Sequence, residues 1–271
     1  MTKTVLITGA SSGFGKETAK LFHKKGWNVI ATMRSPEKEQ ELTKLENTLV
    51  TQLDVQDTKT IEDAVEAGIK KFGTIDALVN NAGYGLMGVF ESATSEQIQK
   101  QFEVNVFGMM MVTQAVLPHL RKKEKGTIVN VSSFGGIVGL PFTSLYASSK
   151  FAVEGFSEAL SHELFKLNIS VKIIEPGGVH TNFRTGLDII KNEIEEYNSL
   201  MGAFFERYAK PTENLPKASP EDVAATIFQA ATDESDKLRY VVGDDGQFYI
   251  DTKLKNTEEK FVESIRDFFI N

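Results

Sequence analysis

The stretch that decides the fold is Thr4-Val-Leu-Ile-Thr8-Gly9-Ala-Ser-Ser-Gly13-Phe-Gly15. A short apolar run passes into a glycine-rich loop, and residues 16–25 then follow a helical pattern. In this order, glycines let the backbone approach a diphosphate, while the helix N-terminus offers N–H groups and a positive dipole end. The stretch therefore predicts a dinucleotide-binding strand–loop–helix unit. The contacts predicted from its loop are those of Gly9, Ser11, Ser12, Gly13, Phe14 and Gly15.

A P-loop is the competing interpretation of these glycines, because Gly15 is followed by Lys16. Ala10 occupies the position where that motif requires its first glycine. Glu17 replaces the Ser or Thr that would hold magnesium. The P-loop interpretation therefore fails.

Apolar runs of strand length alternate with helical patterns along the rest of the chain. Further strands are predicted at 27–32, 49–53, 75–79, 128–131, 169–174 and 239–243, and helices at 36–48, 58–72, 95–120 and 146–167. This alternation is typical of βαβ units, and right-handed crossovers place their helices on both faces of a parallel sheet. We predict one α/β domain over residues 1–271, with a Rossmann-type doubly wound sheet of about seven strands.

The end of the second predicted strand bears on the choice of cofactor. A fold that binds NAD(H) usually places an acidic residue there to hold the ribose 2′-hydroxyl group. This chain has Met33 and Arg34 instead, and an arginine suits a 2′-phosphate. The sequence favours NADP(H), although Arg34 as an ordinary surface arginine remains an open interpretation.

Tyr146 and Lys150 are four residues apart, so on a helix both side chains leave the same face. A cation beside a phenol lowers its pKa toward the range useful for acid–base work. Ser133 follows a predicted strand, where a catalytic hydroxyl is common in open α/β sheets. A tyrosine and a lysine at this spacing also occur on solvated helix faces, so the pair needs its context. Asn105, within an apolar predicted helix, needs polar partners if it is buried.

Together these pieces resemble the short-chain dehydrogenase/reductase family over residues 3–181, on the hydroxysteroid and retinol dehydrogenase side of its shorter branch. The motifs that carry the resemblance are T-G-x-x-x-G-x-G at Thr8 to Gly15, Asp54, N-N-A-G at Asn80 to Gly83, Asn105, Ser133, Y-x-x-x-K at Tyr146 to Lys150, and Pro176-Gly177. All of them occur in family order and spacing, and residues 239–243 match the family's last strand.

The resemblance implies a role for each matching position. Tyr146 would exchange a proton with the substrate oxygen, Ser133 would hydrogen-bond that oxygen, and Lys150 would lower the pKa of Tyr146 and bind the nicotinamide ribose. Asn105 would hold a water in a proton relay. The remaining cofactor contacts implied are those of Asp54, Val55, Asn81, Ala82, Gly83, Pro176, Gly177, Val179 and Thr181.

Residues 182–218 match no motif and are expected to decide the substrate. Their apolar side chains recur in steps of three and four and predict one helical stripe, which runs through Phe183, Leu187, Ile190, Ile194, Tyr197, Met201, Phe204 and Tyr208. Two interpretations stay open. The stripe either caps the core or forms a lid with an aromatic, apolar pocket beneath it.

Composition limits the partners. The chain lacks cysteine, so thiolate metal sites and disulfides are excluded, and its four histidines are isolated, so no metal site is predicted. A net charge of −7 without a basic stripe argues against nucleic acid. No apolar stretch is long enough to span a bilayer, and the start lacks a signal peptide pattern, so a cytoplasmic protein is expected. The acid pair Asp244-Asp245 is expected to be solvated.

The predicted activity is NADP(H)-dependent interconversion of a ketone or aldehyde with an alcohol, on a lipophilic or aryl substrate. Two alternatives stay open: a protein of this fold that senses NADP(H) or acts as a scaffold without turnover, and an NAD(H)-dependent dehydrogenase of hydroxysteroid type. The resemblance also implies a possible homodimer or homotetramer, formed through the helices that contain Asn105 and Tyr146.

Overall fold

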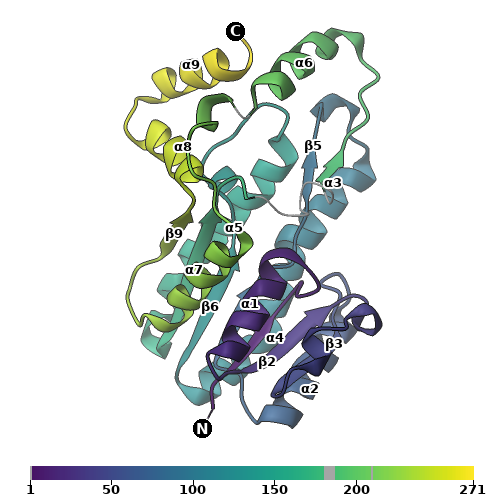
Figure 1. Cartoon of the computed structure of the whole chain (residues 1–271), viewed down its shortest axis with the longest axis vertical. Helices are drawn as coiled ribbons and strands as arrows, with labels where there is room; N and C mark the ends of the chain where they lie inside the picture. The colour runs from purple at the N-terminus through teal and green to yellow at the C-terminus, as the bar shows by residue number, and fades with distance from the viewer. Residues whose placement is uncertain (1, 180–186, 209) are drawn as a thin grey trace.

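The computed structural model describes residues 2–179, 187–208 and 210–271. Within these ranges, seven parallel strands form one sheet in the order β3-β2-β1-β4-β6-β7-β9 (Figure 1). The strands are β1 (Thr4–Ile7), β2 (Asn28–Met33), β3 (Thr48–Gln52), β4 (Ala77–Asn80), β6 (Gly126–Val131), β7 (Ile169–Pro176) and β9 (Arg239–Val242). The strand order reverses between β1 and β4, which is the point where such sheets bind ligands at their carboxyl ends. The predicted doubly wound sheet is confirmed.

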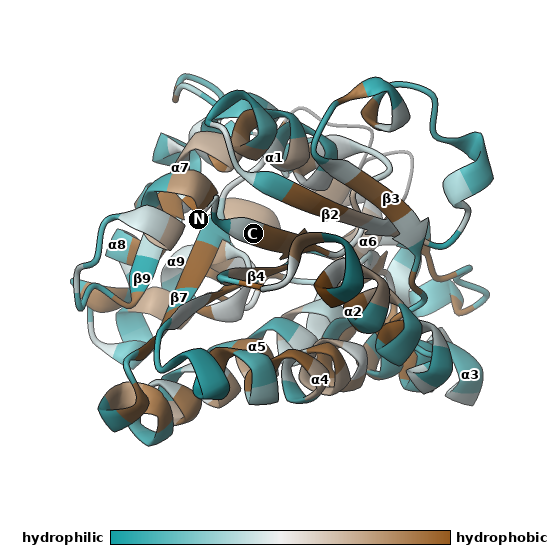
Figure 2. Ribbon diagram, turned by 90° about the horizontal axis from the view of Figure 1, so that it is seen from below, coloured by the Kyte–Doolittle hydropathy of each residue, from teal (hydrophilic) through white to brown (hydrophobic). Residues whose placement is uncertain are grey.

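Helices cover both faces of this sheet (Figure 2). One face carries α1 (Gly13–Lys24) and α7 (Pro220–Thr232), and the other carries α2 (Thr58–Phe72), α4 (Gly108–Lys123) and α5 (Ser144–Leu164). The alternation of side chains along β1 explains the two layers. Val5 and Ile7 pack in the cluster of α1 and α7, whereas Leu6 packs in the cluster of α2, α4 and α5.

A third layer lies beyond the carboxyl end of the sheet, where Figure 1 shows α6, α8 and α9. Its elements are α6 (Asn198–Arg207), α8 (Asp244–Leu254), α9 (Glu258–Phe269) and a parallel pair of short strands, β5 (Gly85–Met87) and β8 (Leu187–Ile189). Phe204 of α6 is fully buried there among the rings of Phe142, Tyr208 and Phe269. This aromatic cluster places apolar surface next to the edge where the ligand site is expected.

Two predictions of helices, one over residues 36–48 and one along the stripe at 182–218, were wrong. Residues 36–48 form only two 3₁₀ turns, Pro36–Lys38 and Leu42–Lys44, instead of a helix. The buried carboxylate of Glu39 accepts the backbone N–H groups of Glu41 and Leu42, which competes with helical hydrogen bonding. The stripe at 182–218 is likewise not one helix, because Leu187 lies in β8 and pairs with β5. Phe183 lies outside the described residues.

The predicted helix over 95–120 is interrupted at the position of Asn105. It consists of α3 (Ser95–Phe102), a π-helical turn over Glu103–Phe107, and α4. Helix α7 begins with a reciprocal capping box between Ser219 and Asp222. Among the described residues, no helix has both the length and the apolar character needed to cross a bilayer.

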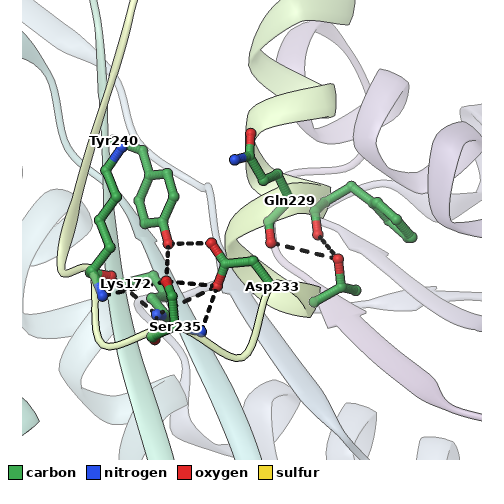
Figure 3. Close-up of polar contacts among 8 residues, drawn as sticks. Lys172, Gln229, Asp233, Ser235 and Tyr240 are labelled. Atoms are coloured by element: carbon green, nitrogen blue, oxygen red, sulfur yellow. Dashed lines mark hydrogen bonds and ion pairs between the residues drawn. The ribbon is translucent and has the colours of Figure 1, made fainter.

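A buried polar cluster ties the loop between α7 and β9 to β7 (Figure 3). Lys172 of β7, with a side chain 2% exposed, donates to the backbone carbonyls of Ser235 and Lys237. The hydroxyl of Tyr240 in β9 donates to Asp233 at 2.6 Å, and Asp233 lies 3.7 Å from the Lys172 ammonium. These contacts hold the last strand against the sheet, away from the ligand edge.

Candidate active site

A cavity of about 880 Å³ opens at the carboxyl ends of the central strands. It extends from the loop after β1, past Tyr146, to residues of β8, α6 and α8. The predicted site residues that line it are Gly9, Ser11, Ser12, Gly13, Phe14, Arg34, Asp54, Val55, Asn81, Ala82, Gly83, Ser133, Tyr146, Lys150, Pro176, Gly177 and Val179. Gly15 and Asn105 lie behind this lining, and Thr181 lies outside the described residues.

The glycine loop has the shape that a diphosphate requires. Gly9 and Gly13 have positive φ angles of 69° and 54°, which an L side chain rarely adopts. A Cβ at Gly15 would clash with the carbonyl of Gly9 and the amide of Asn81. No side chain caps the start of α1, whose residues Gly13 and Phe14 line the cavity, so its first N–H groups remain available to a ligand. A side chain at these glycines would fill or distort the cradle, so the loop fits a dinucleotide phosphate.

Asn81 holds this loop in place. Its side-chain nitrogen donates to the carbonyls of Thr8 at 2.9 Å and Gly9 at 3.1 Å. The hydroxyl of Thr8 in turn accepts the backbone N–H groups of Asn81 and Ala82, both at 3.0 Å. These hydrogen bonds therefore connect the end of β1 to the end of β4. Asn81 fixes the shape of the predicted cofactor site as well as lining it.

One end of the cavity lies next to β2 and β3, on the other side of β1 and β4 from β6 and α5. It is lined by Arg34, Asp54 and Val55. Arg34 is exposed and has no ion-pair partner in the described part of the chain. The carboxylate of Asp54 accepts the backbone N–H of Gln56 at 3.0 Å. An unpaired guanidinium at this position suits an anionic group on the ribose.

Tyr146 and Ser133 meet where the two halves of the cavity join. Tyr146 lies in the first turn of α5, and Ser133 begins the 3₁₀ turn Phe134–Gly136 after β6. The two side chains are neighbours, because a Cβ on Gly135 would lie 3.3 Å from the Tyr146 ring and 3.4 Å from the Ser133 hydroxyl oxygen. The Ser133 hydroxyl accepts the backbone N–H of Gly135 at 3.0 Å. The structure thus brings the two predicted hydroxyls together.

Lys150 lies one turn later on α5 and is 8% exposed. Its ammonium donates to the carbonyl of Val131 at 2.9 Å and lies 5.8 Å from the centre of the Tyr146 ring. Burial lowers the pKa of Lys150 to about 8. Burial also raises the pKa of Tyr146 to about 12, although the neighbouring Ser133 side chain opposes this rise. The expected lowering of the phenol pKa therefore does not appear here, because desolvation dominates.

Asn105 is held within the π-helical turn, a feature that often marks functional sites. Its amide oxygen accepts the backbone N–H of Tyr84 at 3.0 Å, and its nitrogen donates to the Tyr84 carbonyl at 2.9 Å and the Ser149 hydroxyl at 3.2 Å. A Cβ on Gly83 would lie 3.2 Å from the same amide and 3.9 Å from the Lys150 nitrogen. Asn105 thus joins the strand end after β4 to α5, directly behind the cavity wall.

The loop after β7 is fixed by a residue that sequence reasoning missed. Asp245, expected to be solvated, is 4% exposed and accepts the backbone N–H groups of Gly178 and Gly246. A Cβ at Gly177 would clash with its carboxylate. Its contact with a loop 67 residues away could not be seen from its neighbours in the chain. The solvated interpretation of Asp245 was wrong.

Apolar and aromatic side chains make up much of the other half of the cavity, together with polar residues such as Lys100, Asp188 and Lys217. Its lining includes Met87, Phe134, Val138, Leu140, Leu187, Phe205, Tyr208 and Tyr249. Phe134 stacks on Tyr249 of α8, with ring centres 5.2 Å apart. The sequence pointed to Leu187 and Tyr208 in the variable segment, but not to Tyr249, which lies 103 residues after Tyr146. In the described residues, no group of three His, Cys, Asp or Glu side chains could hold a metal ion.

A dinucleotide cradle, a hydroxyl pair and a buried lysine define an oxidoreductase of the nicotinamide-dependent class. The family model described as short chain dehydrogenase matches residues 3–189, and the chain belongs to this family. The resemblance found in the motifs is confirmed.

Relatives of known sequence agree with this assignment. An uncharacterized oxidoreductase of Schizosaccharomyces pombe is 45% identical over 78% of this chain and 89% of its own length. A 3-ketodihydrosphingosine reductase of Bacteroides thetaiotaomicron is 37% identical over 88% of this chain and 87% of its own. Human retinol dehydrogenase 8 is 42% identical over 67% of this chain and 60% of its own.

Solved structures share the fold. A short-chain dehydrogenase of Streptomyces avermitilis has a TM-score of 0.83 and 32% identity, over 97% of this chain and 96% of its own. ElxO with NADP bound has a TM-score of 0.75 and 30% identity, over 89% and 98%. A 3-ketoacyl-(acyl-carrier-protein) reductase of Brucella melitensis complexed with NADH has a TM-score of 0.76 and 26% identity, over 89% and 96%.

Proposed function

We propose that the chain interconverts a lipophilic ketone or aldehyde with its alcohol, using NADP(H). One observation carries the proposal: the neighbouring hydroxyl side chains of Ser133 and Tyr146 line the same cavity as the dinucleotide cradle and the aromatic chamber. A carbonyl oxygen bound at this pair would lie at the meeting point of both halves.

The chain's own residues are suited to the proton half of the reaction. When bound, the nicotinamide supplies or accepts the hydride. Tyr146 donates a proton to the substrate oxygen, or takes one from the alcohol, while Ser133 hydrogen-bonds that oxygen. Because burial raises the pKa of Tyr146 to about 12, its ionisation depends on positive charge close to it. Lys150 can supply this charge, because it lies on the same face of α5 one turn after Tyr146.

The preference for NADP(H) rests on Arg34. The second strand ends in an exposed arginine without an ion-pair partner in the described residues, where an acidic residue would favour NAD(H). ElxO carries NADP in its structure, whereas the Brucella reductase carries NADH, so this fold admits both. The guanidinium favours the cofactor with the 2′-phosphate.

The lipophilic substrate rests on the aromatic chamber. The variable segment 182–218 contributes apolar and aromatic side chains to the cavity, those of Leu187, Phe205 and Tyr208, beside the polar ones of Asp188, Thr212 and Lys217. Phe204 of the same segment is fully buried in the aromatic cluster. The segment thus serves both as a core cap and as the proposed substrate lid. The names of two relatives, a 3-ketodihydrosphingosine reductase and a retinol dehydrogenase, are those of enzymes for lipid-like ketones or alcohols.

The test is loss of absorbance from NADPH and, separately, from NADH, against aryl, steroid and long-chain aliphatic ketones. We expect turnover with NADPH and a higher kcat/KM for substrates with larger apolar groups. Tight NADPH binding without turnover on the whole panel would favour a cofactor sensor or scaffold instead. A cytoplasmic location remains a prediction of the sequence.

Self-association through the outer face of α4 and α5 is also proposed. Phe107, Met111 and Phe151 are 50%, 39% and 42% exposed on the helices that the family resemblance implies for dimers or tetramers. Burial of these side chains against a second copy would remove apolar surface from water. Sedimentation of the protein and of a Met111→Glu variant tests this, with a monomeric wild type as the contrary result.

A further inference from the structure

Two carboxylates and one arginine lie behind Lys150, outside the lining of the cavity. Glu154 follows Lys150 by one turn on α5, Glu175 lies near the end of β7, and Arg239 begins β9. The Arg239 Nε atom is 3.0 Å from Glu154 and 3.5 Å from Glu175. The side chains of Glu154 and Glu175 are only 6% and 2% exposed. Neither carboxylate has a part in the mechanism described above.

The cluster contains more buried negative charge than its arginine can neutralise. One oxygen of Glu154 and one of Glu175 are buried without a hydrogen-bond partner in the described residues. A third carboxylate, that of the half-exposed Glu158, accepts a hydrogen bond from the Nη2 atom of Arg239 at 2.5 Å. Two buried carboxylates so close to each other cannot both stay ionised, so the pair retains a proton.

The surroundings indicate which member holds that proton. Burial and the nearby charge of Glu154 raise the pKa of Glu175 to about 7. Burial raises the pKa of Glu154 as well, but Ser132, Arg239 and Lys150 all oppose it. Glu154, the carboxylate closer to Arg239, is therefore the member whose charged form is favoured, and Glu175 is the one that more readily takes a proton. The ionisable groups that face the pair are Lys150 and Glu158 on α5 and Arg239 on β9.

We propose that Glu154 is a positioning residue of the reaction, which acts through Lys150: its carboxylate, fixed by Arg239, keeps the lysine charged behind Tyr146. The geometry supports this because Tyr146, Lys150 and Glu154 are spaced by four residues each and leave one face of α5. Burial lowers the pKa of Lys150, and the charge of Glu154 opposes this effect. The inference rests on the proposed roles of Tyr146 and Lys150.

The first test needs no substrate. A charged Lys150 binds the ribose hydroxyls of the cofactor, so NADPH affinity should weaken as the lysine loses its proton. Binding is measured by NADPH fluorescence between about pH 6 and pH 10 for the wild type and Glu154→Gln. We expect the weakening to begin about one pH unit lower in the variant, because one neighbouring opposite charge has been removed.

The second test follows kcat/KM against pH with the best ketone of the panel. In Glu154→Gln the alkaline limb should move in the same direction and by a similar amount. Glu158→Gln is the matched control, since it removes a carboxylate from the same arginine and helix but at the exposed end. Its profile should coincide with that of the wild type.

Superimposable pH curves for Glu154→Gln and the wild type would overturn the proposal, even if the variant were less stable. If Glu154→Gln does not fold, Glu154→Asp replaces it, with an intermediate shift expected and an absent shift contrary. A wild type that binds NADPH but turns over no ketone would refute the proposed function alone, because the binding curves would still decide the role of Glu154.

Discussion

The Oδ2 atom of Asp245 accepts the backbone N–H of Gly178 at 2.8 Å, which joins the first turn of α8 to the loop after β7. The other oxygen of the same carboxylate accepts the N–H of Gly246 at 2.9 Å. The loop held in this way begins at Gly177, which lies in the cavity wall next to Pro176 at the end of β7. Helix α8, which carries Tyr249 at the substrate end of the cavity, thus also fixes a loop with predicted cofactor contacts.

The first prediction concerns this anchor. Asp245→Asn keeps the shape but leaves one acceptor oxygen for two N–H groups, so the loop should lose its fixed position. A hydrogen bond to a charged acceptor contributes about 1.5–3 kcal/mol, so we expect the KM for NADPH to rise about tenfold or more. Steady-state kinetics at saturating ketone measures this. The exposed neighbour Asp244 is the control, and an equal effect of Asp244→Asn would contradict the anchor.

A second prediction concerns the proposed proton donor. Tyr146→Phe removes only the hydroxyl group and keeps the ring, so the cavity wall should stay intact. General acid–base groups contribute about 10²–10⁴ in rate, and we expect kcat to fall within this range while the Kd for NADPH changes less than about twofold. Single-turnover kinetics and fluorescence titration give the two quantities. Tyr197→Phe, on the outside of the variable segment, should behave as the wild type. Substantial activity in Tyr146→Phe would exclude it as the acid.

A third prediction concerns the choice of cofactor. Arg34→Gln removes the unpaired guanidinium at the ribose end of the cavity. Loss of a charge-assisted contact to a 2′-phosphate should weaken NADPH binding about tenfold to a hundredfold, while NADH binding changes little. Isothermal titration with both cofactors measures the difference. Arg121→Gln removes the same charge from the far end of α4 and should leave both affinities unchanged. Equal loss for both cofactors would rule out the 2′-phosphate contact.

The glycine loop, the strand ends and α5 could be predicted because each depends on residues close in the chain. Gly9 and Gly13 need a left-handed backbone within one turn, and Tyr146 and Lys150 need only one helix face. The contacts of Glu154 with β7 and β9 could not be predicted in this way. They depend on which strands become neighbours in the sheet. Arg239, the first residue of β9, follows Glu154 by 85 residues in the chain.

The variable segment shows a different limit of sequence analysis. The spacing of Leu187 and Ile190 fits a helical stripe, but Leu187 lies in β8 because β5 offers it an edge to pair with. Strand formation depends on such a partner more than on the segment's own residues. The α-helix predicted by this spacing forms only over Asn198–Arg207, where Phe204 packs in the aromatic cluster.

The last prediction concerns stability and its dependence on pH. Burial opposes ionisation of Asp233, but hydrogen bonds from Tyr240 and Ser235 and the charge of Lys172 outweigh it and lower the pKa of Asp233 (Figure 3). An acid whose pKa is lower in the folded state stabilises the fold above its unfolded pKa, and this contribution is lost as pH falls through the folded pKa. Tyr240→Phe removes the 2.6 Å hydrogen bond to this carboxylate without changing the ring.

We therefore expect Tyr240→Phe to lower the free energy of unfolding by about 1–2 kcal/mol at neutral pH. The loss should shrink below about pH 4, where Asp233 is protonated in the unfolded chain as well. Urea unfolding at several pH values measures both effects. Tyr197→Phe also removes a hydroxyl bonded to a carboxylate, that of Glu91, but at the surface, so its Tm should not change. A loss in Tyr240→Phe that is independent of pH would show that the hydroxyl does not act through Asp233.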